Sequence, residues 1–265
     1  MIIKITIIIV GFFVFASFWG FYQSVRPPKF ISKHTPENFG LDFEKIFFKT
    51  DDGLNLSGWF VPARADDSRK QHAKKTIVIL HGYPADKGDL LPSTAFLANE
   101  YNLLFFDFRY LGESQGRYST AGAKETKDLD AAIKFLKSKD INEVGVFGFS
   151  MGGAVALMSA PKIPEIKAVV SEASYSSLDR LAPDLYRLKG LNHILGYLTT
   201  VWGKIILGVD AKNVSPAESV KKISISVLII HSPDDEVIPF SHALLIKEAL
   251  SNNKKAEFLF EKGLY

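Results

Sequence analysis

Six short apolar runs, separated by longer stretches with helical patterning, constrain the fold of this chain more than any other feature. The runs are TIVILHG (76–82), NLLFFDF (102–108), EVGVFGF (143–149), IKAVVSE (166–172), SVLIIHS (226–232) and AEFLFE (256–261). The helical stretches between them include residues 120–137, 151–160 and 241–250. Continuous apolar strands that alternate with helices are typical of a mostly parallel sheet with helices on both faces. The sequence therefore predicts an α/β fold.

Two further segments extend this α/β core. Residues 43–61 (FEKIFFKTDDGLNLSGWFV) are predicted to form two strands joined by a turn at Asp52 and Gly53. Residues 178–218 are rich in Leu, Tyr and Trp and too long for a simple connection. We expect a helical, lid-like insertion over the carboxyl edge of the sheet, with an ordinary covering helix pair as the alternative. The α/β domain is thus predicted to span residues 43–265.

The first 25 residues are predicted to form a single transmembrane anchor. No charged residue occurs among the 21 positions from Ile5 to Val25. As a helix they would span roughly 31 Å, which is about the thickness of a bilayer's hydrocarbon core. A cleaved signal peptide is the alternative, but ASFWG makes a poor cleavage site. Residues 26–42 are predicted to be a linker, and the basic residues on both sides of the span leave its orientation open.

Charge and cysteine usage exclude several classes of function. The 32 basic and 29 acidic residues give a net charge of +3, which is too balanced to predict a nucleic-acid partner. The absence of cysteine removes disulfides, thiolate metal sites and cysteine nucleophiles. We expect no metal and no organic cofactor.

The segment GFSMG, residues 148–152, matches the nucleophile-elbow pattern G-x-S-x-G. In that motif a sharp strand-to-helix turn lifts the serine, here Ser150, above the edge of the sheet. Gly148 and Gly152 supply positions where a side chain would clash with the turn. A predicted strand precedes the motif and a predicted helix follows it, which favours a nucleophile over a helix-capping serine.

Four motifs together carry a family resemblance. They are HGYPADKGDLL, FDFRYLGESQG, GFSMGG and LIIHSPDDEVIP, and they occur in the expected order. From about residue 43 to its end, the chain resembles the α/β-hydrolase superfamily, in its serine aminopeptidase and carboxylesterase-like branch. The resemblance implies an α/β-hydrolase fold with a mostly parallel central sheet, helices on both faces and a helical lid.

The resemblance also implies roles for residues at and after the ends of the first three central strands. The backbone N–H groups of Tyr83 and Met151 would form the oxyanion hole. His81 precedes the serine in the chain, so we interpret it as structural. Asp107 and Arg109 fall in a family turn motif, where a turn-stabilising ion pair is favoured over catalytic charges.

The catalytic acid is expected in HSPDDEVIP. In the family the acid lies four residues after the strand-end histidine, which here is Asp235, with Asp234 as the fallback. Its carboxylate would orient the catalytic histidine and stabilise the imidazolium.

The catalytic histidine should follow the last strand, AEFLFE, but the sequence then reads only KGLY and ends at Tyr265. The six histidines lie elsewhere, at positions 34, 72, 81, 193, 231 and 242, and His242 is a weak fallback. We therefore expect the histidine loop and a closing helix to lie beyond Tyr265. Without a base, the printed chain would keep only residual catalysis, about 10³–10⁴ over water.

These patterns predict a membrane-anchored serine hydrolase. Ser150 would attack a carboxylic ester, thioester or amide through an acyl-enzyme intermediate. The apolar insertion suggests a hydrophobic acyl substrate. The alternatives are a non-catalytic, membrane-anchored scaffold of the same fold, and an acyltransferase.

Overall fold

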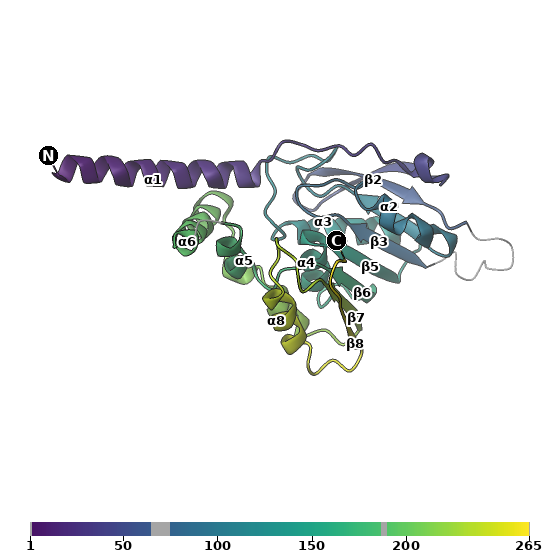
Figure 1. The fold of residues 1–265 in the computed structure, drawn as a ribbon. Coiled ribbons are helices and arrows are strands. Elements are labelled where there is room, and N and C mark those ends of the chain that lie inside the picture. Colours follow the sequence, from purple (N-terminus) through teal and green to yellow (C-terminus); the bar gives the residue numbers. More distant parts are fainter. Residues whose placement is uncertain (1, 65–74, 187–189, 265) are drawn as a thin grey trace.

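The computed structural model describes residues 2–64, 75–186 and 190–264, and within these ranges eight strands form one sheet. The strands are β1 (Glu44–Lys49), β2 (Asn55–Val61), β3 (Thr76–Leu80), β4 (Asn102–Phe106), β5 (Val144–Phe149), β6 (Ile166–Glu172), β7 (Ser226–His231) and β8 (Ala256–Phe260). Their order across the sheet is β1-β2-β4-β3-β5-β6-β7-β8 (Figure 1). Each of the six apolar runs forms a strand, which confirms the predicted α/β fold.

The sheet is antiparallel at one edge and parallel elsewhere. β1 and β2 form the predicted hairpin, and β2 pairs antiparallel with β4. At the hairpin turn, the N–H of Gly53 donates to the carbonyl of Thr50. From β4 to β8 all neighbouring strands are parallel. Parallel strands need crossover connections, and these supply the helices that cover the sheet.

The structure describes eight α-helices and four short helical turns. The α-helices are α1 (Ile2–Val25), α2 (Leu91–Thr94), α3 (Glu125–Ser138), α4 (Met151–Ser159), α5 (Leu178–Asp184), α6 (Asn192–Trp202), α7 (Pro216–Val220) and α8 (Ser241–Ala249). The short turns are η1 (Pro36–Phe39), η3 (Ala95–Asn99), η4 (Gly203–Leu207) and η5 (Ala211–Asn213). Helices α3, α4, α7 and α8 bury apolar side chains in the main core on one face of the sheet.

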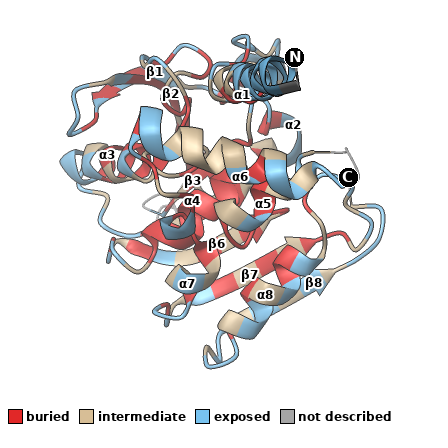
Figure 2. Cartoon of the chain, turned by 90° about the vertical axis from the view of Figure 1, so that its left-hand side faces the viewer, coloured by how far each residue is buried: buried red, intermediate tan, exposed pale blue. Residues whose placement is uncertain are grey.

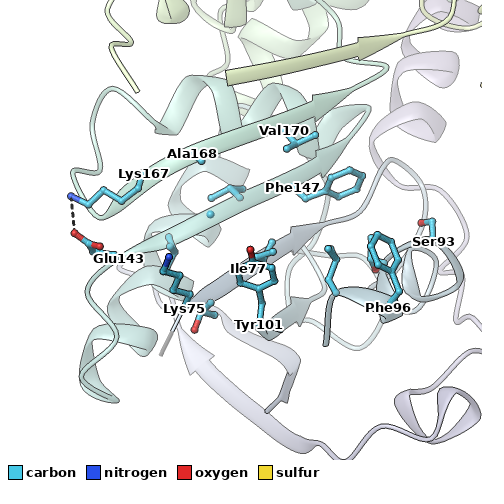
Figure 3. Close-up of a pocket in the computed structure, with 16 residues that line it drawn as sticks. Lys75, Ile77, Ser93, Phe96, Tyr101, Glu143, Phe147, Lys167, Ala168 and Val170 are labelled. Atoms are coloured by element: carbon cyan, nitrogen blue, oxygen red, sulfur yellow. Dashed lines mark ion pairs between the residues drawn. The ribbon is translucent and has the colours of Figure 1, made fainter. Parts of the chain in front are cut away.

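The opposite face is covered by α2 and η3 over β2, β4 and β3, where Trp59, Leu91 and Phe105 are buried. Beside them lies an apolar groove of about 520 Å³, with Phe147 and Val170 among its walls (Figure 3). The residues before these two, Val146 and Val169, belong to the main core. Because side chains alternate along a strand, the groove lies on the sheet face away from α4.

The described part of residues 178–218 is helical, as predicted, and contains α5, α6, η4 and η5 together with the start of α7. Gly196 allows α6 to approach α5 closely, because a Cβ at that position would lie 2.6 Å from the backbone nitrogen of Pro183. Figure 2 shows α6 next to α1, which is seen end-on with a largely exposed surface.

Helix α1 extends well beyond the sheet (Figure 1). Its residues 3–16 are exposed, whereas Ser17 and Phe21 are buried against the rest of the chain. The helix from Ile3 to Val25 is long and apolar enough to cross a membrane. The structure therefore contains the long apolar helix that was predicted, and its last turns pack on the α/β domain.

Candidate active site

Ser150 lies at the sharp turn between β5 and α4. Its φ of 51° and ψ of −115° place a non-glycine residue in a strained region of backbone space. Its N–H donates to the carbonyl of Glu172 at 2.7 Å, which ties the turn to β6. A Cβ at Gly148 would lie 2.4 Å from the carbonyl carbon of Gly152, and one at Gly152 would lie 2.2 Å from the carbonyl oxygen of Leu80. Both glycines are therefore required by the close approach of backbone segments.

The loop after β3 runs alongside this turn. A Cβ at Gly82 would lie 3.4 Å from the Cβ of Ser150, so little space separates the loop from the serine. Tyr83 and Met151 line the same pocket as Ser150. The Tyr83 hydroxyl donates to the carbonyl of Ser24 on α1 at 2.5 Å, and burial raises the pKa of this phenol. The loop thus contacts both the serine turn and the N-terminal helix.

His81 is held in a structural position, in agreement with the sequence interpretation. It is fully buried, and its Nε2 accepts the N–H of Phe108 at 3.0 Å. Its Nδ1 lies 2.7 Å from the carbonyl oxygen of Gly82, so the proton sits on Nδ1. Burial lowers the pKa of His81, which favours the neutral ring. His81 therefore links the loop after β3 to the end of β4.

The loop after β7 contains the two candidate acids. Oδ1 of Asp235 accepts the N–H groups of Val237 and Ile238 at 2.8 and 2.9 Å, and its side chain is 6% exposed. Asp234 is exposed instead, and the Ser232 hydroxyl lowers the pKa of its carboxyl. Val237 and Ile238 line the pocket that contains Ser150. Asp235 is thus the ordered, buried carboxylate of the pair.

His242, the fallback base, is buried on the first turn of α8 and has other partners. Its Nδ1 accepts the N–H of Ser176 at 3.0 Å, and its Nε2 lies 3.0 Å from a carboxylate oxygen of Asp184. Burial lowers the pKa of His242. Both ring nitrogens are therefore occupied by groups other than Ser150.

The remaining histidines lie away from the serine or outside the described residues. His34 and His193 are exposed, and His231 is buried with its Nε2 2.8 Å from the carbonyl oxygen of Ile238. His72 falls outside the described residues. Among the residues that the structure describes, no histidine forms a hydrogen bond with Ser150.

A pocket of about 380 Å³ opens at Ser150. It is bounded by the loops after β3 and β7, by the helical segment 178–211, and by the last turns of α1. Among the described residues that line it, none carries a charged side chain. The pocket can therefore accommodate an apolar group next to the serine hydroxyl.

The sequence model of the dienelactone hydrolase family matches residues 114–260, which is more than half of the chain. The chain belongs to this family. Among solved structures, an esterase of Pyrococcus furiosus, Pf2001, superposes with a TM-score of 0.73 and 26% identity, covering 91% of this chain and 89% of the esterase. These matches confirm the α/β-hydrolase fold.

Several curated proteins are also similar in sequence to this member of the dienelactone hydrolase family. YqkD of Bacillus subtilis is 29% identical over 71% of this chain, and YfhR of Escherichia coli K12 is 28% identical over 76%; both are uncharacterized. The alignments cover 64% and 66% of those proteins, so the chain spans just under two thirds of their lengths. An uncharacterized membrane protein of Saccharomyces cerevisiae, YNL320W, is 23% identical over 86% of the chain and 75% of its own length.

The predicted ion pair between Asp107 and Arg109 is wrong, because each residue has a different partner. Asp107 pairs with the buried Lys87 at 2.7 Å. Arg109 pairs with Asp128 at 2.6 Å and with Asp52 at 2.8 Å. Arg109 lies in the turn that follows β4, where the fold brings Asp128 and Asp52 to its guanidinium and Lys87 to Asp107.

The contribution of α1 to the pocket was missed by the sequence analysis. Gly20, Phe21, Ser24 and Val25 all line the pocket with Ser150. A weak signal was present in the sequence. Ser17, Gly20 and Ser24 recur at helical spacing in an otherwise bulky apolar helix, which indicates one face built for close packing.

Proposed function

We propose that this chain is the catalytic part of a membrane-anchored serine hydrolase that cleaves a carboxylic ester with Ser150 as its nucleophile. The geometry of the turn at Ser150 carries the proposal, because the strained backbone and the two tightly packed glycines present the serine at the head of an apolar pocket. The similarity to the Pf2001 esterase supports an ester. A thiohydrolase of Arthrinium phaeospermum is 36% identical over 48% of the chain and 42% of its own length. This similarity supports a thioester as the second candidate substrate, and an amide is the third.

The proposed reaction proceeds through an acyl-enzyme. The Oγ of Ser150 forms a bond to the carbonyl carbon while a general base takes the hydroxyl proton. The N–H groups of Tyr83 and Met151 stabilise the negative oxygen of the tetrahedral intermediate. The bond to the leaving alcohol then breaks, the base returns its proton to that alcohol, and water releases the acid by the same steps. No metal or organic cofactor takes part.

We propose that Asp235 orients a histidine that acts as the base, and that this histidine is none of the described ones. Two observations support this assignment. The described histidines are bonded to other groups or exposed, as His242 illustrates. In addition, the N–H of Gly263 donates to Asp234 at 3.2 Å, so the residues after β8 run against the acid loop.

The second candidate is a non-catalytic, membrane-anchored binding protein of the same fold. The engagement of His242 by Ser176 and Asp184 favours it, because the fallback base is thereby unable to serve Ser150. An acyltransferase would share the acyl-enzyme and would differ only in the acceptor that releases it.

Labelling of the full-length protein with a fluorophosphonate probe separates these candidates. We expect labelling of the wild-type protein and its complete loss in Ser150→Ala. Hydrolysis of p-nitrophenyl esters identifies the acceptor as water. Unchanged labelling in Ser150→Ala, or no labelling of the wild-type protein, would contradict the proposed enzyme.

Asp235→Asn and Asp234→Asn form a matched pair for the acid. We expect Asp235→Asn to lower kcat by about 10⁴, as loss of the orienting carboxylate does in serine hydrolases of this kind. Asp234→Asn should leave kcat within about threefold, because an exposed charge contributes little to a buried site. The reverse ranking would assign the role to Asp234.

A further inference from the structure

We infer that the last turns of α1 form one wall of an acyl-chain pocket, so that the N-terminal helix selects the length of the acyl chain that Ser150 accepts. The inference rests on the proposed function and deepens it, because it names the substrate class as esters of aliphatic acids. It also gives the apolar helix a role in the active site in addition to any role as an anchor.

The composition of the pocket favours an aliphatic chain. Its volume of about 380 Å³ lies within the range of small-molecule sites. Aliphatic side chains such as Leu181, Leu207 and Ile238 line it, and none of its described lining residues is charged. A phosphate or carboxylate would lose its hydration in this pocket without gaining an ionic partner, whereas a methylene chain gains about 0.8 kcal/mol for each buried group.

Phe21 anchors α1 in the wall of the pocket. Its side chain is 3% exposed and belongs to the apolar cluster that also contains Tyr175, Leu181 and Leu207. These residues come from the loop after β6, from α5 and from η4. The pocket is therefore bounded jointly by α1 and by the helical insertion.

Polar contacts fix the register of α1 against the domain. The indole N–H of Trp202 donates to the Ser17 hydroxyl at 3.1 Å, and the Trp202 ring packs edge-on against Phe18 with centroids 5.3 Å apart. The N–H of Ser119 donates to the carbonyl of Val25 at 2.9 Å. Together with the bond from the Tyr83 hydroxyl to Ser24, these contacts come from three separate segments of the domain. The helix is thus held as a fixed wall.

Gly20 offers a way to shorten the pocket without disturbing its walls. It lines the pocket, and a Cβ at this position would have no other atom within 4 Å. A Cβ there displaces no protein atom, and we expect the rest of a leucine side chain to occupy pocket space. Gly11 is the matched control, because a Cβ at that position on the same helix also meets no atom within 4 Å, and Gly11 does not line the pocket.

The first measurement is kcat/KM of the full-length protein on p-nitrophenyl acetate, hexanoate, decanoate and palmitate. We expect Gly20→Leu to lower kcat/KM for the longer esters at least about tenfold relative to acetate. The reason is that the leucine removes the space for one or more methylene groups of the acyl chain. Gly11→Leu should retain the wild-type profile. An unchanged profile in Gly20→Leu, or an equal change in Gly11→Leu, overturns the inference.

The second measurement does not depend on catalysis. Dansyl-undecanoate is titrated into detergent-solubilised Ser150→Ala protein, with and without Gly20→Leu, and a detergent blank is subtracted. We expect the Kd to rise about tenfold with Gly20→Leu. If no ester is hydrolysed by any variant, the proposed function fails, and this titration alone decides the inference. Absence of binding, or an unchanged Kd in Gly20→Leu, overturns it.

Discussion

At the scale of single residues, a buried ionic cluster joins the loops that flank the active site. Lys87, in the loop after β3, is 3% exposed and pairs with Asp107, which is fully buried at the end of β4. The same ammonium pairs with Glu113 at 2.8 Å, and Glu113 also pairs with Lys45 at 2.9 Å. Removing a partner from such a cluster leaves an uncompensated buried charge. The cluster therefore stabilises the loop that carries Tyr83.

Glu113 gives this cluster a measurable pH dependence. Hydrogen bonds from Lys87 and then Lys45 lower the pKa of Glu113 from 4.5 to about 2. Because the folded pKa lies below the unfolded value, the stabilisation is fully present above about pH 5 and is lost as the pH falls toward 2. We predict that Glu113→Gln flattens the decline in the free energy of unfolding between about pH 5 and 2, measured by urea denaturation.

Glu37→Gln provides the comparison. Glu37 is exposed and forms no ion pair among the described residues. This variant should retain the wild-type decline in stability at acidic pH. A similar flattening in both variants would show that the pairing of Glu113 with Lys87 is not its source.

At the scale of secondary-structure elements, the junction of β5 and α4 decides whether the serine is presented at all. Gly148 lies against the first turn of α4, since a Cβ there would lie 2.4 Å from the Gly152 carbonyl carbon and 2.5 Å from the Gly153 nitrogen. These neighbours are backbone atoms, so relief of the clash requires a shift of the helix. The junction therefore couples the packing of α4 to the position of Ser150.

We predict that Gly148→Ala lowers the free energy of unfolding by about 1–3 kcal/mol, which is typical of an overpacked interior. It should also slow fluorophosphonate labelling of Ser150 more than stability alone explains. Gly145→Ala on the same strand is the control, because its Cβ would meet only Ile77 at 3.8 Å, an ordinary contact. Equal effects of the two substitutions on labelling would contradict the assigned role of Gly148.

At the scale of the whole molecule, α1 has two parts with different surroundings. Residues 3–16 are exposed and mostly apolar, whereas Ser17 and Phe21 are buried against the domain. An exposed apolar surface of this length is unfavourable in water, which supports a membrane as its environment. The buried part would be lost if the helix were cleaved as a signal peptide, and the pocket would lose a wall.

We predict that the protein stays in the membrane pellet after alkaline carbonate extraction, and that Ile8→Lys with Phe12→Lys releases it. Each lysine near the centre of a span costs about 2.5–3.5 kcal/mol. Phe30→Lys with Ile31→Lys is the matched control, since both residues are exposed but follow the helix. Retention of the first variant, or an intact mass that lacks α1, would contradict the anchor.

The strands, the hairpin and the glycine-flanked serine were predictable because each depends on a local pattern. Apolar runs identify β3 to β8, and G-x-S-x-G specifies the turn at Ser150. The ion-pair partner of a charged residue was not predictable from the spacing of residues in the sequence. Arg109 could be assigned to Asp107 by proximity in the chain, but the fold brings Asp128 and Asp52 to it instead.

The amino-acid sequence alone therefore determined the fold class, the nucleophile candidate and the long apolar helix. Only the tertiary structure decided that this helix closes the pocket, that His242 is held by Ser176 and Asp184, and that Lys87 neutralises Asp107. The physical reason is the range of the contacts. Periodicity and turn chemistry act over a few residues, whereas the bond from Tyr83 to Ser24 joins positions 59 residues apart and exists only once the chain has packed.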